Sequence, residues 1–200
     1  MKIITVAHQK GGVGKTTLSL NLASCLRKSG LKIAVLDTDV QGSLAETSHT
    51  LEDITIVSPD ELSNIHKMTY DILVIDTPPY LTNSLHEIFS ISDYVLVPTN
   101  IGVYDVLAIR ATLAIIQKVQ NERPSLKYGV VLNRVRAGTS LIKDILDMLK
   151  SYNAIVLKTR IHERISYARS ALTNGIFGTE DVKAHDEIFN LTEEIINTLK

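Results

Sequence analysis

Residues 8–17 have the sequence His8-Gln9-Lys10-Gly11-Gly12-Val13-Gly14-Lys15-Thr16-Thr17. An apolar, β-branched run, Ile3-Ile4-Thr5-Val6-Ala7, precedes them, and a helical stripe of Leu18, Leu22 and Leu26 follows. A strand, a glycine-rich turn and a helix in this order are the context of a phosphate-binding loop. Glycines let the backbone approach a phosphate closely, and the N–H groups of the helix start then face the anion. The segment therefore predicts a phosphate site, with the Lys15 ammonium on the β- and γ-phosphates and the Thr16 hydroxyl at Mg²⁺.

The loop differs from the ordinary pattern at its start. Gly-x-x-x-x-Gly-Lys-Thr would need a glycine at position 9, where the chain has Gln9, and a second lysine, Lys10, begins the loop. Lys-Gly-Gly-Val-Gly-Lys-Thr-Thr resembles the deviant Walker A motif of the ParA/MinD family of ATPases. The resemblance implies that Lys10 crosses a dimer interface to touch the nucleotide of the other subunit. It also implies that ATP is bound by Lys10, Gly11, Gly12, Val13, Gly14, Lys15, Thr16 and Thr17.

A second motif follows the apolar run at 31–36. It is Asp37-Thr38-Asp39-Val40-Gln41-Gly42-Ser43, and carboxylates at the end of a strand point into the crevice where α/β sheets bind ligands. The motif resembles the family's Asp-x-Asp-Pro-Gln-Gly segment, with Val40 where proline is usual. The resemblance implies that Asp37 supports the Mg²⁺ site and that Asp39 positions or activates the attacking water. The expected catalytic residues are thus Lys10, Lys15 and Asp39. The alternative for Asp37 and Asp39 is that these aspartates only cap a turn.

A third motif is Asp71-Ile72-Leu73-Val74-Ile75-Asp76-Thr77-Pro78-Pro79. Four apolar residues that end in an aspartate are typical of a buried parallel strand with a Walker B carboxylate. Asp76 is therefore expected to bind Mg²⁺, together with Thr16 and Asp37. Residues 77–79 resemble the family's second switch loop, which senses the γ-phosphate.

Further strands and helices alternate along the chain. We expect strands at 54–57, 93–98, 128–134 and 154–157, and helices at 104–120, at 141–149 and over the last residues, where Ile188, Leu191, Ile195 and Leu199 share one face. Residues 59–61 can open a short helix. This order predicts an α/β fold, a mostly parallel twisted sheet with helices on both faces. We expect a single P-loop ATPase domain over 1–200, without the N-terminal DNA-binding extension of larger family members.

One polar residue lies near the end of the strand expected at 128–134. Asn133 resembles the family position that hydrogen-bonds adenine, and an amide can match an adenine edge because it carries both donors and an acceptor. An asparagine that only stabilises a turn is the alternative.

Charge is nearly balanced over the whole chain, with a net charge of −1 in 200 residues. Any nucleic-acid contact must therefore come from a local patch. Residues 118–136 contain five Lys or Arg and one Glu, and residues 158–169 contain four Lys or Arg and one Glu. Lys158, Arg160, Arg164 and Arg169 are the candidate DNA contacts, with a solvated surface as the alternative. The spacing Arg164-x-x-Tyr167, followed by Gly175, looks like the small plasmid-partition members of the family.

The whole pattern resembles a small ParA-type partition ATPase. The resemblance implies ATP and Mg²⁺ as cofactors, an ATP-bound homodimer that coats DNA nonspecifically, and a centromere-binding adaptor protein that stimulates slow hydrolysis. It implies a cytoplasmic, nucleoid-associated protein and no membrane partner.

Three rival functions remain. The first is a MinD-like membrane-surface ATPase that positions a division or flagellar machine, but the acidic Glu187, Glu193 and Glu194 differ from a basic lipid-binding helix. The second is an ATP-dependent ligase, for which no substrate pocket is evident in the sequence. The third is an iron–sulfur reductase, which the single cysteine, Cys25, disfavours.

Overall fold

The computed structural model describes residues 1–38, 54–80, 84–136 and 138–200. Its strands form one seven-stranded sheet in the order β3-β2-β4-β1-β5-β6-β7, and every pair of neighbours is parallel. The strands are β1 (Lys2–Val6), β2 (Ile33–Asp37), β3 (Thr55–Val57), β4 (Ile72–Asp76), β5 (Tyr94–Thr99), β6 (Lys127–Val135) and β7 (Val156–His162). The predicted fold class, a parallel sheet flanked by helices, is confirmed.

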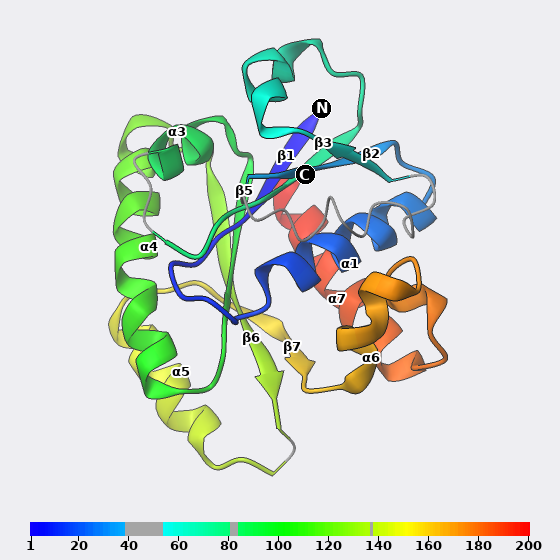
Figure 1. Cartoon of the computed structure of the whole chain (residues 1–200). Helices are drawn as coiled ribbons and strands as arrows, with labels where there is room; N and C mark the ends of the chain where they lie inside the picture. Colours follow the sequence, from blue (N-terminus) through cyan, green and yellow to red (C-terminus); the bar gives the residue numbers. More distant parts are fainter. Residues whose placement is uncertain (39–53, 81–83, 137) are drawn as a thin grey trace.

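Helices cover both faces of the sheet (Figure 1). On one face lie α1 (Lys15–Lys28), α6 (Ile165–Arg169) and α7 (Val182–Leu199). On the other lie α3 (Ser84–Ile91), α4 (Val103–Glu122) and α5 (Leu141–Ser151). Three short 3₁₀ segments complete the described elements: η2 (Pro59–Lys67), η3 (Ser170–Leu172) and η4 (Ile176–Gly178).

The apolar runs of the strands supply two hydrophobic cores. Because successive strand residues point to opposite faces, Ile4 and Val6 join the core beneath α1 and α7, while Ile3 joins the core beneath α3, α4 and α5. A parallel sheet with helices on both faces is buried on both sides, which explains why its strands have almost no polar alternation. Within the described ranges, no helix has the length and apolar character needed to cross a bilayer.

One local prediction needs correction. The last strand spans 156–162 rather than 154–157, so Lys158 and Arg160 belong to β7. This strand lies at the edge of the sheet, where outward-facing residues can be charged, and its burial alternates for that reason. Helix α3 was not predicted, and the short helix expected near 59–61 is a 3₁₀ segment, with Ser58 and Glu61 forming a capping box.

The sheet order decides where the sequence motifs meet. The central strand β1 lies between β4 and β5, with β2 and β3 beyond β4 and with β6 and β7 beyond β5. The strand order therefore changes direction at β1, although all the strands run parallel. Ligands of open α/β sheets bind beside the carboxyl ends of the strands at such a point. Three features therefore lie together at the carboxyl ends of the strands: the loop after β1, Asp37 at the end of β2 and Asp76 at the end of β4. Asp39 and Val40 lie outside the described residues.

Candidate nucleotide-binding site

The loop after β1 turns through left-handed glycine conformations. Gly12 has φ 75° and Gly14 has φ 91°, values that residues with a side chain rarely adopt. Gly14 is also the N-cap of α1, and a Cβ there would collide with the amide of Asn133. The two glycines thus fix the path that leads the chain from β1 into α1, whose first N–H groups then face the loop.

A buried carboxylate lies behind the first turn of α1. Asp76 accepts a hydrogen bond from the Thr16 hydroxyl (2.6 Å) and another from the Ser19 hydroxyl (3.0 Å). Asp37 pairs with Asp76 across the neighbouring strands β2 and β4, and both residues are buried. Burial raises the pKa of the Asp76 carboxyl to about 7, although the two hydroxyls act in the opposite direction.

This arrangement fits a Mg²⁺ site completed by phosphate. Two buried carboxylates and a hydroxyl converge, and Mg²⁺ in nucleotide sites takes one or two carboxylates, with the other ligands from phosphate and water. In the described part of the chain, no group of three or more His, Cys, Asp or Glu could hold a metal ion alone. Thr16, Asp37 and Asp76 are thus suited to a metal that arrives with a nucleotide.

The two lysines of the loop have different surroundings. Lys15 is buried, and its ammonium donates to the carbonyl oxygen of Lys10 over 3.3 Å. The Lys10 side chain is 42% exposed, and its ammonium lies 2.8 Å from Oδ1 of Asp105, in the first turn of α4. Lys15 therefore belongs to the interior of the loop, whereas Lys10 lies at its rim.

A buried histidine supports the start of the loop. His8 accepts a hydrogen bond from the backbone N–H of Lys10 through Nδ1 (2.9 Å), which places the ring proton on Nε2. Burial lowers the pKa of His8 to about 4, and the nearby Lys15 ammonium contributes in the same direction. His8 is therefore a neutral hydrogen-bond acceptor near neutral pH.

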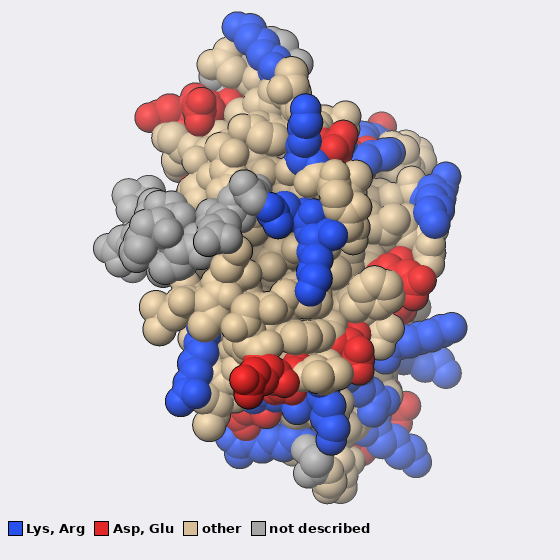
Figure 2. All heavy atoms as spheres, turned by 90° about the vertical axis from the view of Figure 1, so that its right-hand side faces the viewer, with Lys and Arg blue, Asp and Glu red and all other residues tan. Residues whose placement is uncertain are grey.

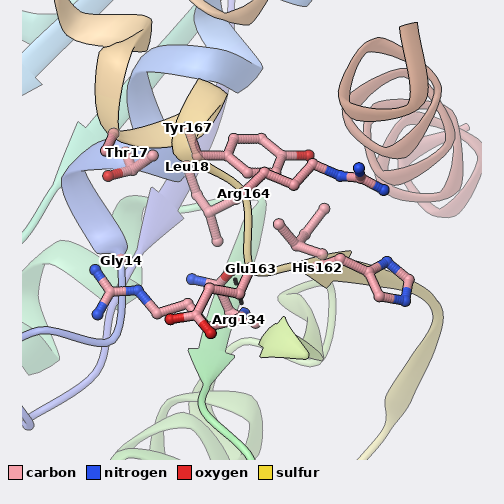
Figure 3. A pocket seen from close by; sticks show the side chains of 11 residues that line it. Gly14, Thr17, Leu18, Arg134, His162, Glu163, Arg164 and Tyr167 are labelled. Carbon is pink, nitrogen blue, oxygen red and sulfur yellow. Dashed lines mark hydrogen bonds between the residues drawn. The ribbon is translucent and has the colours of Figure 1, made fainter. Parts of the chain in front are cut away.

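A cavity of about 300 Å³ opens beside the loop (Figure 3). Its size lies at the lower end of the range of small-molecule sites. Three segments line it: the loop with the start of α1, the end of β6, and the corner between β7 and α6. The lining residues are Gly14, Thr17, Leu18, Asn133, Arg134, Ile161, His162, Glu163, Arg164, Tyr167 and Ala168.

Asn133 is part of this wall, but its amide already has partners. Its Nδ2 donates to the carbonyl of Val13 (2.7 Å), and its Oδ1 accepts from the N–H of Arg134 (2.9 Å). The amide therefore ties the end of β6 to the loop, and the adenine contact expected for it stays a prediction. At the rim, Glu163 forms an exposed ion pair with Arg136.

The basic residues at 158–169 divide into two groups. Lys158, Arg160 and Arg169 are exposed, and none of their side chains belongs to an ion pair among the described residues. Arg164 is only 23% exposed and is paired with Glu187 and Asp181 of the α7 region. Figure 2 shows lysines and arginines gathered at the lower end of the face over α1, α6 and α7, with carboxylates among them.

Several residues at this site were not predicted from the sequence. These residues are Asp105, Ser19 and Glu187, which contact Lys10, Asp76 and Arg164, respectively. Each is distant from its partner along the chain and is of a residue type that is common on protein surfaces. The only signal for Asp105 is a carboxylate in the first turn of a long helix, which is typical of any helix start.

Three features together define a P-loop nucleotide-binding protein: the change in strand order at β1, the glycine-rich loop after β1, and the buried carboxylates beside it. More specifically, the chain belongs to the family of the CobQ/CobB/MinD/ParA nucleotide binding domain, whose model matches residues 4–175. P-loop members of the ParA/MinD group are generally ATPases.

Individual relatives span nearly the whole chain. The maintenance of carboxysome distribution protein A of Halothiobacillus neapolitanus (strain ATCC 23641 / c2) is 26% identical, over 96% of this chain and 95% of its own length. A virulence plasmid ParA family protein, pGP5-D of Chlamydia psittaci, is 26% identical over 100% and 96%. A crystal structure of a candidate plasmid partition protein of Borrelia burgdorferi B31, bound to AMPPNP, superimposes with a TM-score of 0.75 at 23% identity, covering 98% of both chains. This last likeness concerns the fold.

Proposed function

We propose that the chain is a ParA-type partition ATPase, which dimerises with ATP and Mg²⁺, binds DNA nonspecifically and hydrolyses ATP when an adaptor protein stimulates it. The observation that carries the proposal is the pair of lysines in one loop. Lys15 is enclosed by the loop, while Lys10 lies at its rim, where a second molecule can be reached. An ordinary phosphate loop needs only the lysine that corresponds to Lys15.

In this proposal the loop and the cavity share one ATP molecule. The N–H groups of residues 11–17 and the Lys15 ammonium bind the phosphates, and the adjoining cavity receives the nucleoside with Asn133 at its wall. Thr16, Asp37 and Asp76 would hold Mg²⁺, which supplies charge neutralisation to the phosphates when bound. Lys10, Lys15 and Asp39 are the proposed catalytic residues.

The proposed dimer face surrounds Lys10. Next to Asp105 in the first turn of α4, Tyr104 is 80% exposed and Val103 is 46% exposed. Neighbouring large apolar side chains on a surface are often part of an interface. A second copy docked here would bring its nucleotide toward Lys10, in agreement with the role that the resemblance gives this lysine.

The proposed DNA face includes Lys158, Arg160 and Arg169, which are exposed. Arg164, which we expected among the DNA contacts, is better explained by its internal ion pairs. The relatives named for plasmid ParA function and for carboxysome distribution support a partition role but differ in cargo. Nucleoid association and a centromere-binding adaptor are parts of this proposal.

A lipid-binding role for α7 has less support. Its apolar stripe of Ile188, Leu191 and Ile195 is buried in the core, although Val182 and Phe189 are exposed, and two of its carboxylates bind β7. The main apolar stripe of the helix is therefore engaged within the chain, whereas membrane-surface binding requires such a stripe to be free.

The test compares three variants by sedimentation and ATP turnover, with ATP or ADP present. Lys15→Ala should weaken ATP binding by about 100-fold or more, because the phosphates lose a buried cation. Lys10→Ala should keep ATP binding and lose ATP-dependent dimerisation. Lys32→Ala is the control, because Lys32 lies just before the amino end of β2, at the end of the strands away from the loop. It should change neither property. A Lys10→Ala variant that still dimerises with ATP and turns it over at the unaltered rate would contradict the proposal.

A further inference from the structure

The Arg164-x-x-Tyr167 spacing has a structural explanation that does not involve nucleic acid. Both side chains leave the corner between β7 and α6 and meet one carboxylate, that of Glu187 on α7. In Figure 3 the Tyr167 hydroxyl and the Arg164 guanidinium point to the same side, away from Gly14. The motif is therefore engaged within the chain, and both of its residues also line the cavity beside the loop.

Glu187 accepts five hydrogen bonds from three lining residues. Oε1 accepts from Arg164 Nη2 (2.7 Å) and Nε (3.2 Å) and pairs with His162 Nδ1 (2.9 Å). Oε2 accepts from the Tyr167 hydroxyl (2.9 Å) and from the backbone N–H of His162 (3.1 Å). The Glu187 carboxylate thus holds His162 at the end of β7, Arg164 immediately before α6, and the Tyr167 side chain within α6.

The carboxylate is suited to this position because it is largely shielded and fully ionised. The Glu187 side chain is 12% exposed. Burial alone would raise its pKa, yet the pKa of Glu187 is lowered, since Arg164, His162 and Tyr167 hydrogen-bond to the charged form. Hydrogen bonds to an ionised group are shorter and stronger than neutral ones, so the geometry of the corner depends on this charge.

We propose that Glu187 is the positioning residue of the nucleoside pocket: by holding His162, Arg164 and Tyr167, it keeps the wall beside Gly14 in the shape that accepts a nucleoside. The proposal rests on the proposed function, because it takes the cavity to be the nucleoside part of an ATP site. Glu187 touches no phosphate-binding residue, so its effect is confined to the nucleoside half of the ligand.

The same helix offers a matched control. Glu194 also links α7 to β7, and its carboxylate accepts from the N–H groups of Lys158 (2.8 Å) and Thr159 (3.1 Å) and from the Thr159 hydroxyl (3.0 Å). None of these partners lines the cavity. Glu187→Gln and Glu194→Gln therefore remove equivalent attachments, of which only the first supports the pocket.

The experiment measures the affinity of the full chain for Mg²⁺-ATP and for Mg²⁺-tripolyphosphate by calorimetry. Glu187→Gln should weaken ATP binding about tenfold, because the amide nitrogen cannot accept from the cavity residues, and should leave tripolyphosphate binding unchanged. Glu194→Gln should leave both affinities unchanged, although its melting temperature falls. Tyr167→Phe, which keeps the ring and removes one donor, should weaken ATP binding about threefold and carries the test if Glu187→Gln does not fold.

Four results would overturn the proposal. Equal losses for ATP and tripolyphosphate, or equal losses in the Glu187 and Glu194 variants, would show a general destabilisation. Unchanged ATP affinity in both Glu187→Gln and Tyr167→Phe would show that the wall does not depend on Glu187. If the unaltered chain binds tripolyphosphate but gains nothing from the nucleoside, the cavity assignment is wrong. If it binds neither ligand, the proposed ATPase function itself is wrong.

Discussion

The ammonium of Lys10 lies 2.8 Å from Oδ1 of Asp105, so the lysine that distinguishes this loop is held by the chain's own α4. Asp105 sits in the first turn of α4, behind Gly102, where a Cβ would come within 2.5 Å of Oδ2. The helix dipole stabilises a negative charge at a helix N-terminus. Lys10 can therefore leave Asp105 for a phosphate without leaving an unstabilised charge.

We expect Asp105→Asn to promote ATP-dependent dimerisation. The substitution removes the competing anion, so Lys10 is free to reach the nucleotide of a second copy. Because the pair is partly solvent-exposed, its contribution is small, and the dimer dissociation constant should fall by about two- to fivefold. Sedimentation over a protein concentration series, with ATP or with ADP, measures this shift.

Asp144→Asn is the control for that comparison, because Asp144 is an exposed carboxylate in the first turn of α5. It should leave dimerisation unaltered. A weaker ATP dimer in Asp105→Asn would show instead that Asp105 positions Lys10 for the interface.

We expect Asp76→Asn to remove the dependence of ATP affinity on Mg²⁺. The amide can still accept from the Thr16 or Ser19 hydroxyl, so the loop keeps its support, but it no longer provides an anionic ligand. Calorimetric titration with ATP, in magnesium and in chelator, measures the ratio of the two affinities, which should approach one. Ser19→Ala removes a hydrogen bond to the same carboxylate and should retain the full magnesium effect; loss of that effect in Ser19→Ala would argue against a metal role for Asp76.

The buried His8 predicts a loss of stability in mild acid. Its pKa is about 4 in the folded chain and about 6.5 when unfolded, so the unfolded state binds the extra proton between these values. Its stabilising contribution is therefore complete above pH 6.5 and decreases as the pH falls toward 4. Between about pH 7 and pH 5 the free energy of unfolding should fall by about 2 kcal/mol through His8 alone.

Urea unfolding of His8→Asn at both pH values isolates that contribution. The introduced asparagine would not titrate, and its Oδ1 can replace the imidazole Nδ1 as the acceptor for the N–H of Lys10. The variant should lose about 2 kcal/mol less than the unaltered chain between about pH 7 and pH 5. Equal losses in the two proteins would contradict the assignment of the acid effect to His8.

The loop, most of the strands and the parallel character of the sheet could be predicted from the sequence, because they depend on local patterns and on the alternation of strands and helices. A few neighbouring residues are enough to interpret each of these features: the glycines at 12 and 14, the apolar runs of β1 and β4, and the aspartates that end β2 and β4. Helix α3 could not be predicted with the same ease, since its eight residues contain only two turns of periodic pattern. Short helices depend on tertiary packing more than on propensity.

The partners of the charged residues depend on the tertiary structure. Arg164 was expected to contact DNA because it lies in a basic stretch, yet a carboxylate 23 residues further along the chain holds it. Lys10 and Asp105 are likewise brought together only by the packing of α4 against β5, the neighbour of the central strand β1. A basic count along a sequence cannot distinguish an exposed arginine such as Arg169 from one that is paired internally.

Substitution of the exposed cations should weaken DNA binding equally on all sequences. Arg160→Ala and Arg169→Ala each remove one phosphate contact per subunit, so two contacts per dimer are lost. The slope of log affinity against log salt should therefore decrease by about 1.8 for each variant. Fluorescence anisotropy with a labelled duplex measures these slopes, and Lys32→Ala should keep the original one. A variant that weakens binding to only one sequence would indicate a base contact instead.

The most direct test of the proposed function is the binding of the unaltered chain to two unrelated DNA duplexes, with ATP and with ADP, across a salt series. A chain with a net charge of −1 has little general attraction for phosphate, whereas a dimer doubles the local basic contacts. We predict binding with ATP only, equal affinity for both duplexes and a steep decrease with salt. Equal binding with ADP, a strong preference for one duplex, or no dependence on salt would contradict the assignment of this chain as a ParA-type partition ATPase.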